Sequence, residues 1–450
     1  MTSGRPRGYA PREGSKIGLK TPLVAVAEAD MIPPSACVAQ LDRASVFETE
    51  GWGFDSLRAR LLHAAARHCI LAVEAANAAT PDRALAKAVE RLSDLYTTRR
   101  GSLPTEQANA FYLTAKREYF LASDAPKVAI ALSECAAASA AFAHLPTLAT
   151  VRVTDLGAGV GATSVGFIGW LAGERARRAI TTPVRIELHA VELGEPAARA
   201  YEESVKAAAS TVAGVTLAIK IEARDFRKFT PPPCDLTLCQ TALNELLLGA
   251  EHERATVELV SIWSRAAPTL VIEPALKTTT RALMALRDAL VQLGGAHIVA
   301  PCLHQLPCPM RAREGDWCHE ARRIEPTPRV AAIDKIVGRR DERALFSFLA
   351  TAPGAAPARA TNLVELRLVT DTLGSRGKTE RLVCRADGQL RMMRLLDRET
   401  TDENRMFVDA ERGDVVTVDP LPANDRIAPT ADVQRGGENL DAENLGAETP

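Results

Sequence analysis

The strongest constraint on this chain is the alternation of apolar strand-like runs with amphipathic helical runs over residues 150–300. The helical runs carry apolar side chains at three- and four-residue steps. Alternation of this kind builds a mostly parallel sheet that helices cover on both faces. We therefore expect one doubly wound α/β domain here. Its strands are expected in the runs VRVTDLG, VRIELHAVEL, VTLAIKIEARDF, CDLTLCQTAL, TLVIEP and AHIVAP.

The segments on either side of this region differ from it in composition and periodicity. Residues 51–149 have helical periodicity and predict a helical domain of about five helices. Residues 301–350 contain a group of cysteines and then AIDKIVGRRDERALFSFLA, a run we expect to be helical. Two strand-like runs joined by a Gly-Ser-Arg-Gly turn predict a small antiparallel β unit over residues 360–418. A basic segment, 1–50, and an acidic one, 419–450, are both expected to be disordered.

Composition argues against several classes of protein. The 450 residues are 46% hydrophobic and 25% charged, as in ordinary globular domains, and the formal net charge is −1. Bulk charge therefore gives no sign of a nucleic-acid partner, and only local charge can. The sequence has no apolar run of transmembrane length and no signal-type segment, so we expect no membrane span. Nine cysteines in a chain of this length do not indicate a disulfide scaffold.

The first expected strand ends in a glycine-rich turn, DLGAGVGATS. Asp155 closes the strand, and Gly157, Gly159 and Gly161 follow at alternate positions. Glycine permits positive φ and a close approach of the backbone to a ligand. The helix that follows presents free N–H groups, which favour a phosphate or a carboxylate. Such a loop alone is compatible with a dinucleotide site or with a turn that binds nothing.

Residues at the next two strand ends narrow the choice. Glu192 ends the second strand, and Asp225 and Phe226 end the third. The G-x-G-x-G spacing after an acid resembles the first motif of class I S-adenosylmethionine (SAM) methyltransferases. In such proteins the second-strand acid holds the ribose hydroxyls, and the third-strand residues contact adenine. The resemblance therefore implies a Rossmann-like SAM-binding domain, with an NAD-type site as the alternative.

The sequence after the fourth strand, CQTALNELLLG, lacks the Asn/Asp-Pro-Pro-aromatic motif of amino-group methylases. Asn244 and Glu245 begin a helix at the rim, where they either face a substrate or serve only as the helix entry. Cys234 and Cys239 lie on an apolar strand, which favours buried structural roles over nucleophilic ones. The residues therefore leave open whether the chain is an enzyme.

Cysteines gather directly after the α/β region, in APCLHQLPCPMRAREGDWCHEARR. Cys302, Cys308 and Cys318 lack the close C-x2–4-C pairs that are usual in structural zinc sites. Iron–sulfur clusters take four thiolates at more varied spacings. His304 and His319 are interpreted as neighbours of the site rather than ligands. From spacing alone, an iron–sulfur cluster, a zinc site and a loop without metal all stay open.

In order, DLGAGVGATS, QTALNEL, VIEP, APCLHQLPCPM…DWCH and DERALFSFLA resemble the methyltransferase-like small-ribosomal-subunit proteins (mitochondrial-type Rsm). These occur in bacteria and as mitochondrial ribosome assembly factors. The resemblance implies SAM and a 4Fe–4S cluster as cofactors. The cluster's four ligands match Cys302, Cys308, Cys318 and Cys384. The family also implies a partner, the small ribosomal subunit with its rRNA, and a cytoplasmic location in a bacterium or, alternatively, the mitochondrial matrix.

Local charge gives modest support for an rRNA partner. Residues 301–400 contain eighteen Lys and Arg against thirteen Asp and Glu. The candidates for phosphate contacts are Arg322, Arg323, Arg339, Arg340 and Arg343.

We therefore expect a SAM-binding, iron–sulfur factor of the small subunit that acts in assembly or translation and is monomeric off the ribosome. It is methyltransferase-like but does not need to transfer a methyl group. An active SAM-dependent rRNA methyltransferase is the first alternative. A small-molecule methyltransferase with a structural zinc is the second.

Overall fold

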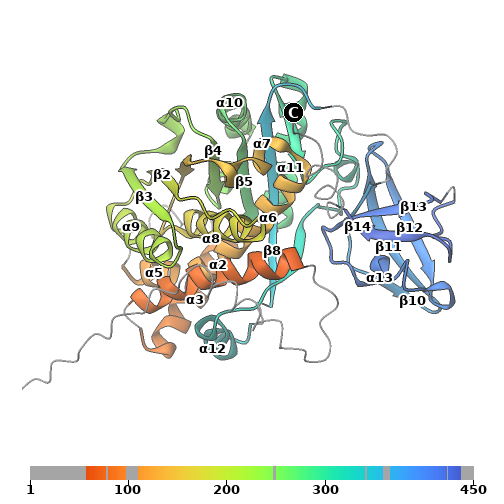
Figure 1. The fold of residues 1–450 in the computed structure, drawn as a ribbon, viewed down its shortest axis with the longest axis horizontal. Coiled ribbons are helices and arrows are strands. Elements are labelled where there is room, and N and C mark those ends of the chain that lie inside the picture. The colour runs from red at the N-terminus through yellow and green to blue at the C-terminus, as the bar shows by residue number, and fades with distance from the viewer. Residues whose placement is uncertain are drawn as a thin grey trace, which may run out of the picture.

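The computed structural model describes residues 57–77, 80–97, 110–246, 250–339, 342–357, 365–422 and 424–436. The predicted basic segment 1–50 and the end of the acidic segment lie outside the described residues. Within the described part, a large sheet with helices on both faces forms one body, and a smaller sheet forms a second body beside it (Figure 1). None of the described helices is both long and apolar enough to cross a membrane.

Helical elements precede the larger sheet, alternate with its strands and recur after it. They are α2 (Leu57–Ala76), α3 (Asp82–Thr97), α5 (Ala110–Ala115), the π-helical turn η2 (Lys116–Phe120), α6 (Leu121–Ala138), α7 (Ala140–Ala143), η3 (Leu145–Thr147), α8 (Ala162–Arg177), α9 (Glu195–Ser210), η4 (Phe226–Lys228), η5 (Leu243–Glu245), α10 (Ala250–Ala266), α11 (Lys277–Leu293), η6 (Pro309–Ala312), α12 (Pro328–Val337), η7 (Asp397–Glu399) and α13 (Met406–Asp409).

The larger sheet has the order β3-β2-β1-β4-β5-β8-β6 in the described residues, with β7 also pairing with β8. Its strands are β1 (Thr150–Leu156), β2 (Val184–Val191), β3 (Val215–Glu222), β4 (Leu236–Gln240), β5 (Thr269–Pro274), β6 (Ala296–Ala300), β7 (Glu320–Arg323) and β8 (Arg343–Pro353). The pairs among β1 to β5 are parallel, and β8 runs antiparallel to β5, β6 and β7. This is the doubly wound α/β fold with a mostly parallel sheet that the sequence predicted.

One strand of this sheet corrects the sequence prediction. DERALFSFLA was expected to be helical, but its residues form most of β8, which inserts between β5 and β6. A strand that is buried on both faces is a continuous apolar run, and periodicity alone does not separate such a run from a buried helix. The α/β body therefore extends beyond residue 300, to Pro353.

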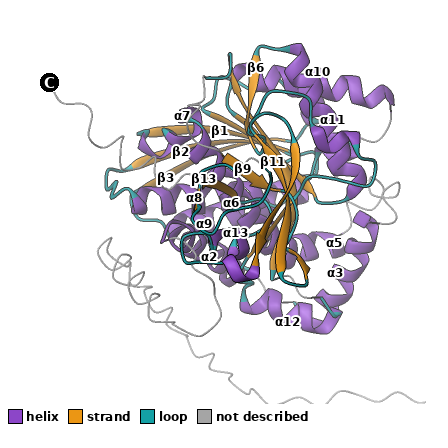
Figure 2. Ribbon diagram, turned by 90° about the vertical axis from the view of Figure 1, so that its right-hand side faces the viewer, coloured by secondary structure: helices purple, strands orange, loops and turns teal. Residues whose placement is uncertain are grey.

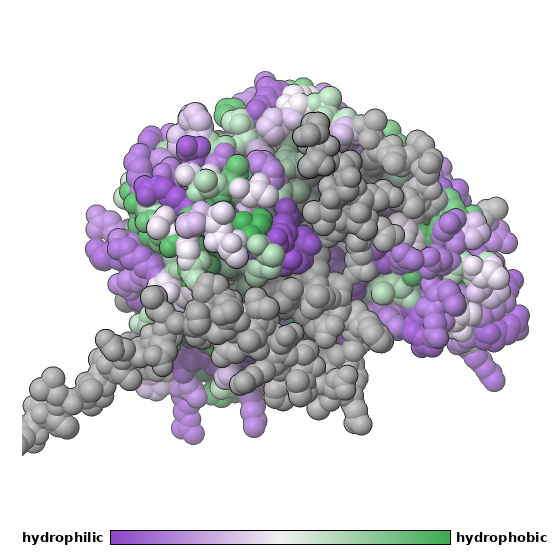
Figure 3. All heavy atoms as spheres, viewed as in Figure 1, coloured by the Kyte–Doolittle hydropathy of each residue, from purple (hydrophilic) through white to green (hydrophobic). Residues whose placement is uncertain are grey.

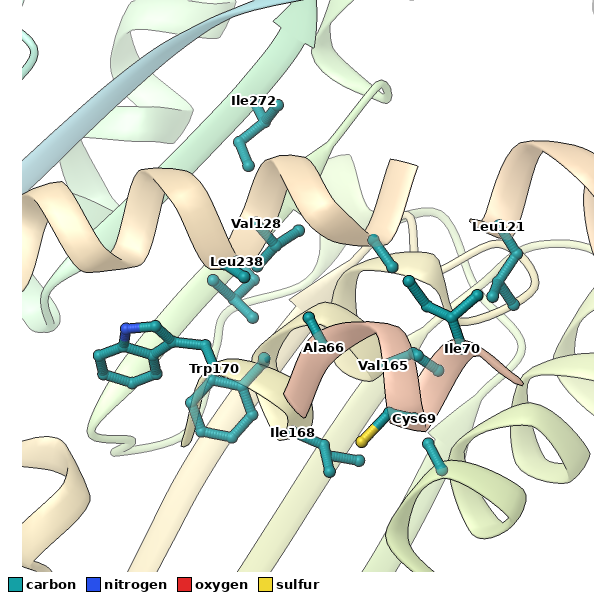
Figure 4. Packing of buried hydrophobic residues seen from close by; sticks show 14 of the residues in the cluster. Ala66, Cys69, Ile70, Leu121, Val128, Val165, Ile168, Trp170, Leu238 and Ile272 are labelled. Atoms are coloured by element: carbon teal, nitrogen blue, oxygen red, sulfur yellow. The ribbon is translucent and has the colours of Figure 1, made fainter. Parts of the chain in front are cut away.

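The helices before β1 form a layer of the α/β body rather than a separate domain. Side chains of α2, α6 and α8 share one hydrophobic core with the strands of the larger sheet, and Figure 4 shows them near Leu238 of β4 and Ile272 of β5. Two glycines of α8 allow the close contact, because a Cβ on Gly166 would lie 2.3 Å from the Ala125 oxygen and one on Gly169 would lie 2.5 Å from the Ala66 Cα. On the other face of the sheet, α10 and α11 pack against β4, β5 and β6.

The smaller sheet forms the predicted antiparallel β unit, and it continues further than predicted (Figure 2). Its strands are β9 (Glu365–Leu368), β10 (Leu373–Ser375), β11 (Lys378–Arg385), β12 (Leu390–Leu396), β13 (Val415–Asp419) and β14 (Asp432–Arg435). Because β14 pairs with β13 and Val433 is buried in the core of the unit, the disorder expected from residue 419 onward is wrong as far as Arg435. The face of the unit seen in Figure 3 is largely hydrophilic.

Candidate functional site

The glycine loop lies where β1 and β4 end side by side. Gly157, Gly159 and Gly161 have φ values of 69°, 54° and 98°, which side chains rarely adopt. A Cβ on Gly157 would lie 2.6 Å from the Cβ of Ala242, in the loop after β4. The sequence needs glycine here both for the backbone conformation and for the space.

Two carboxylates hold this loop in different ways. Glu192, after β2, accepts the N–H groups of Gly159 and Gly194, each at 2.9 Å. Asp155 is fully buried; its Oδ2 accepts the Ser164 hydroxyl at 2.6 Å, and its Oδ1 has no hydrogen-bond partner. Burial raises the pKa of Asp155 to about 7, with a further contribution from the Glu192 carboxylate. Asp155 therefore has one oxygen without a hydrogen-bond partner, and its carboxyl group is partly protonated near neutral pH.

The turn after the third strand brings one predicted residue against the loop and leaves the other half-buried beside it. The Phe226 ring would lie 3.8 Å from a Cβ on Gly157. Asp225 accepts the backbone N–H of Arg227 at 3.0 Å and also pairs with its guanidinium. These hydrogen bonds hold the pKa of Asp225 below its usual range. The structure thus brings Asp155, the three glycines, Glu192 and Phe226 to the carboxyl edge of the sheet, with Asp225 beside them.

Glu273, at the end of β5, organises the loop after β4, and the sequence analysis did not identify it. One oxygen accepts the N–H groups of Leu243 and Asn244 at 2.9 and 3.2 Å, and the other accepts the Asn244 side-chain amide at 2.8 Å. Asn244 is therefore buried and turned toward Glu273, not toward a substrate as one interpretation allowed. The side chain of Glu245 lies outside the described part of the structure. The position of Glu273 at a strand end was the available signal, the same one that identified Glu192.

The two strand cysteines take no part in this site. Cys239 is buried in the core, and burial raises the pKa of its thiol well above the usual range. Cys234 is half-buried, with its sulfur 3.5 Å from the Thr237 hydroxyl. Cys239 has the buried position on a strand that the sequence favoured, whereas Cys234 lies just before β4 and is only half-buried.

All four cysteines implicated by the resemblance line one cavity of about 40 Å³ between the two bodies. Cys302, Cys308 and Cys318 come from the loop between β6 and β7, and Cys384 comes from β11 of the β unit. An apolar shell that includes Met284, Met310, Val369 and Leu382 surrounds them. Within the described residues, no group of three or more His, Cys, Asp or Glu side chains is placed to hold a metal ion.

Burial disfavours the thiolate form of three of these cysteines. It raises the pKa of Cys308 to about 11 and that of Cys384 to about 12, and raises that of Cys318 well above its usual range. The neighbouring Cys302 contributes to all three increases. His304 is buried beside the site, with its Nε2 3.6 Å from the Cys384 sulfur.

Arginines from both bodies hold the main chain of the cysteine loop. On α11, Arg281 donates to the carbonyl oxygens of Arg311, Arg313 and Asp316. From the β unit, Arg412 donates to the carbonyls of Trp317 and His319. The Trp317 ring in turn donates its Nε1–H to the Ala275 carbonyl at 3.1 Å. The loop is thus fixed by contacts that its cysteine pattern does not reveal.

Four of the five arginines predicted to contact phosphate form ion pairs or hydrogen bonds within the described part of the chain. Arg322 is the clearest correction, because it is mostly buried and forms ion pairs with Glu320 and Asp414. Arg339 donates to Ser93 at 2.7 Å, while Arg323 and Arg343 are exposed but pair with Glu411 and Asp371. Arg340 lies outside the described residues. A charge count along the sequence does not show which charges pair: Glu320 and Asp371 lie inside the counted segment, and Glu411 and Asp414 lie beyond it.

Comparison with known proteins adds a family. A model of the family described as mitochondrial small ribosomal subunit Rsm22 matches residues 128–415, from α6 to the start of β13. The chain belongs to the Rsm22 family. The match includes the glycine loop and all four cavity cysteines of this Rsm22 chain. No curated protein matches the sequence.

Solved structures similar to this Rsm22 chain include methyltransferases. Magnesium protoporphyrin IX methyltransferase from Synechocystis PCC 6803, solved with bound SAH, is 10% identical; the match covers 59% of this chain and 100% of that one, with a TM-score of 0.30. Precorrin-6y C5,15-methyltransferase from Geobacter metallireducens GS-15 is 14% identical over 50% of this chain and 87% of that one, with a TM-score of 0.26. The fold assignment rests on the strand order, not on these similarities.

Proposed function

We propose that this chain is a SAM-binding, iron–sulfur factor that associates with the small ribosomal subunit. The observation that carries the proposal is the meeting of four cysteines in one cavity, three from the loop between β6 and β7 and one from β11 of the β unit. Family membership supports the subunit as partner, with rRNA as the contact within it. The family description favours the mitochondrial alternative over the cytoplasmic one.

The residues at the carboxyl edge of the sheet fit SAM. The glycine loop brings backbone N–H groups to the start of α8, where a carboxylate is favoured. Glu192 is the residue to bind the ribose hydroxyls, and Phe226 offers an apolar surface for adenine. The unpartnered Oδ1 of Asp155 is an acceptor for a cationic or N–H-bearing ligand. SAM, when bound, supplies an electrophilic methyl group.

The cysteine cavity fits a 4Fe–4S cluster better than zinc. A single zinc ion requires its sulfurs about 2.3 Å from one centre. A cluster is larger than one ion and accepts thiolates that stand farther apart around a cavity. Cys302, Cys308, Cys318 and Cys384 would hold it, and the apolar shell would exclude water. Because the ligands come from both bodies, part of the energy of binding would stabilise their docking.

Anaerobic purification tests the cluster. We expect a brown protein with stoichiometric iron and sulfide, and we expect Cys384→Ser to lose both. Cys234→Ser is the matched control, since Cys234 is half-buried and does not line the cavity. A colourless wild-type protein with bound zinc would refute the cluster assignment.

The remaining question is whether the chain transfers a methyl group to an acceptor. The loop after β4 is occupied internally by Glu273 and carries no acceptor motif, so we propose a factor without robust methyl transfer. The active rRNA methyltransferase stays the alternative, because the loop that would hold SAM is intact. Comparing rRNA methylation with and without the gene decides between them, and a lost methyl mark would favour the enzyme.

A further inference from the structure

Two arginines line the cysteine cavity together with the thiols, one from each body. Arg287 belongs to α11 and Arg367 to β9, and each is only 2% exposed. The terminal nitrogens of Arg287 donate to the Asp288 carboxylate and to the carbonyls of His304 and Leu306. These contacts fix the plane of its guanidinium.

Arg367 is held in the same way by different partners. Its terminal nitrogens donate to Glu134 of α6 and to Glu320 of β7. In both arginines the Nε is buried and has no hydrogen-bond partner. A buried donor without an acceptor is unfavourable, because it has lost its hydrogen bonds to water. Both arginines line the same cavity, which points to an acceptor that they share.

We propose that Arg287 and Arg367 donate their Nε–H groups to sulfur atoms of the four-cysteine cluster and offset its negative charge. This inference rests on the iron–sulfur part of the proposed function. Four thiolates around a doubly positive four-iron core leave a double negative charge, and a buried charge needs charged or hydrogen-bonding partners. Because Arg367 comes from the β unit, the charge of the cluster is balanced only when the two bodies are docked.

The chain offers a matched control for each arginine. Arg311 pairs with Asp288, as Arg287 does, but its side chain is 43% exposed. Arg322 pairs with Glu134 and Glu320, as Arg367 does. Neither Arg311 nor Arg322 lines the cavity. Substituting each of the four by lysine keeps the positive charge and removes the guanidinium Nε–H.

The experiment uses the full chain purified without oxygen. It measures bound iron, the rate of iron loss to a chelator, and the midpoint potential of the cluster by spin resonance during reduction. Hydrogen bonds to cluster sulfurs raise that potential. We therefore expect Arg287→Lys and Arg367→Lys to shift it downward and to lose iron roughly tenfold faster, as is typical when groups around metal ligands are removed.

The two control variants show whether a change in potential or iron release comes from lost hydrogen bonds to the cluster or from a disturbed ion network. Arg311→Lys and Arg322→Lys are expected to match the wild type in potential and in iron release. If Arg322→Lys loses iron as fast as Arg367→Lys, the ion network explains the loss and the inference fails. Wild-type behaviour of both cavity variants, in a protein that contains iron, also overturns it while leaving the cluster in place. A wild-type protein without iron overturns the cluster itself.

Discussion

Asp155 and Glu192 lie at the same edge of the larger sheet, yet their surroundings give them different roles. Both oxygens of Glu192 accept backbone N–H groups, so this carboxylate shapes the loop. Asp155 has one oxygen without a partner and is fully buried. Burial raises the pKa of an acid in the folded state, so the folded state loses stability at pH values where the same acid ionises in the unfolded chain. Asp155 therefore lowers the free energy of unfolding at those pH values.

Because burial raises the pKa of Asp155, we expect the stability of the folded chain to depend on pH. Its pKa is about 7 in the folded chain and near 4 when unfolded, so the folded state is penalised increasingly as pH rises from 4 to 7. We expect Asp155→Asn to gain stability over the wild type across this window and to keep the gain above pH 7. Urea unfolding without SAM at several pH values measures it, with Glu195→Gln as an exposed control. A gain that is equal at pH 4 and pH 8 would contradict the prediction.

The glycine loop predicts a second effect at a single residue. Gly157→Ala places a Cβ against Ala242 at positive φ, so we expect loss of measurable SAM binding and a destabilisation of about 1–3 kcal/mol. Gly194→Ala is the control, because its backbone has ordinary φ and its Cβ would make ordinary contacts. Calorimetric titration with SAM distinguishes the two. Equal affinity of both variants would show that the loop is not the cofactor site.

Among the elements, helix α8 contains glycines, which weaken helices, at the positions where it packs closely against other helices. Alanine stabilises a helix over glycine by about 1 kcal/mol in the absence of other contacts. Gly169 instead faces the Ala66 backbone of α2, where a Cβ does not fit. We expect Gly169→Ala to destabilise the chain by about 1–3 kcal/mol, the usual cost of overpacking. Thermal unfolding checks the sign, and a stabilised variant would refute the close packing.

The strands show what a sequence can predict and where it fails. β1 to β6 were predictable because each is an apolar run bounded by turns, and an amphipathic helix separates each from the next except between β3 and β4, where only the short η4 intervenes. β8 was missed because burial on both faces removes any alternation. Glu192 was identified through its strand end and a family pattern. Glu273 and Arg367 were missed because their partners are distant in sequence, and a local pattern contains no information about such pairs. Arg287 pairs with the adjacent Asp288, but its contacts with the His304 and Leu306 carbonyls depend on the folded loop.

For the whole molecule, a buried ion network joins the helical layer, the larger sheet and the β unit. Glu134 and Glu320 both pair with Arg367, and Arg322 links Glu320 to Asp414. A charge in such a network is stabilised only while its partners remain. The docking of the two bodies therefore depends on all of these groups together.

Removing one charge from the network tests this dependence. Glu320→Gln leaves buried arginine charge uncompensated, and we expect a loss of about 3–5 kcal/mol. Hydrogen exchange should rise in β9 and β11 before it rises in β1. Asp371→Asn, which breaks an exposed pair with Arg343, is expected to cost no more than about 1 kcal/mol. Uniform exchange in the Glu320 variant would show that the two bodies unfold as one.

At this scale the sequence also indicated the family correctly, because the cysteine string is specific. The resemblance grouped Cys384 with the loop cysteines, but the sequence did not reveal the ion pairs through which the two bodies meet. The phosphate contact expected at Arg322 failed for the same reason, because Glu134 and Asp414, two of its three acidic partners, lie outside the basic segment.

The placement of β8 has a consequence for how such a protein can arise. The cysteine loop leaves the larger sheet after β6, and the chain returns to that sheet through β7 and β8, with β8 between β5 and β6. The loop is therefore an insertion between strands of the sheet and not an appendage at its end. Exchange of terminal modules can neither add nor remove such a loop without breaking the sheet. A change in its set of cysteines requires substitutions within the loop itself.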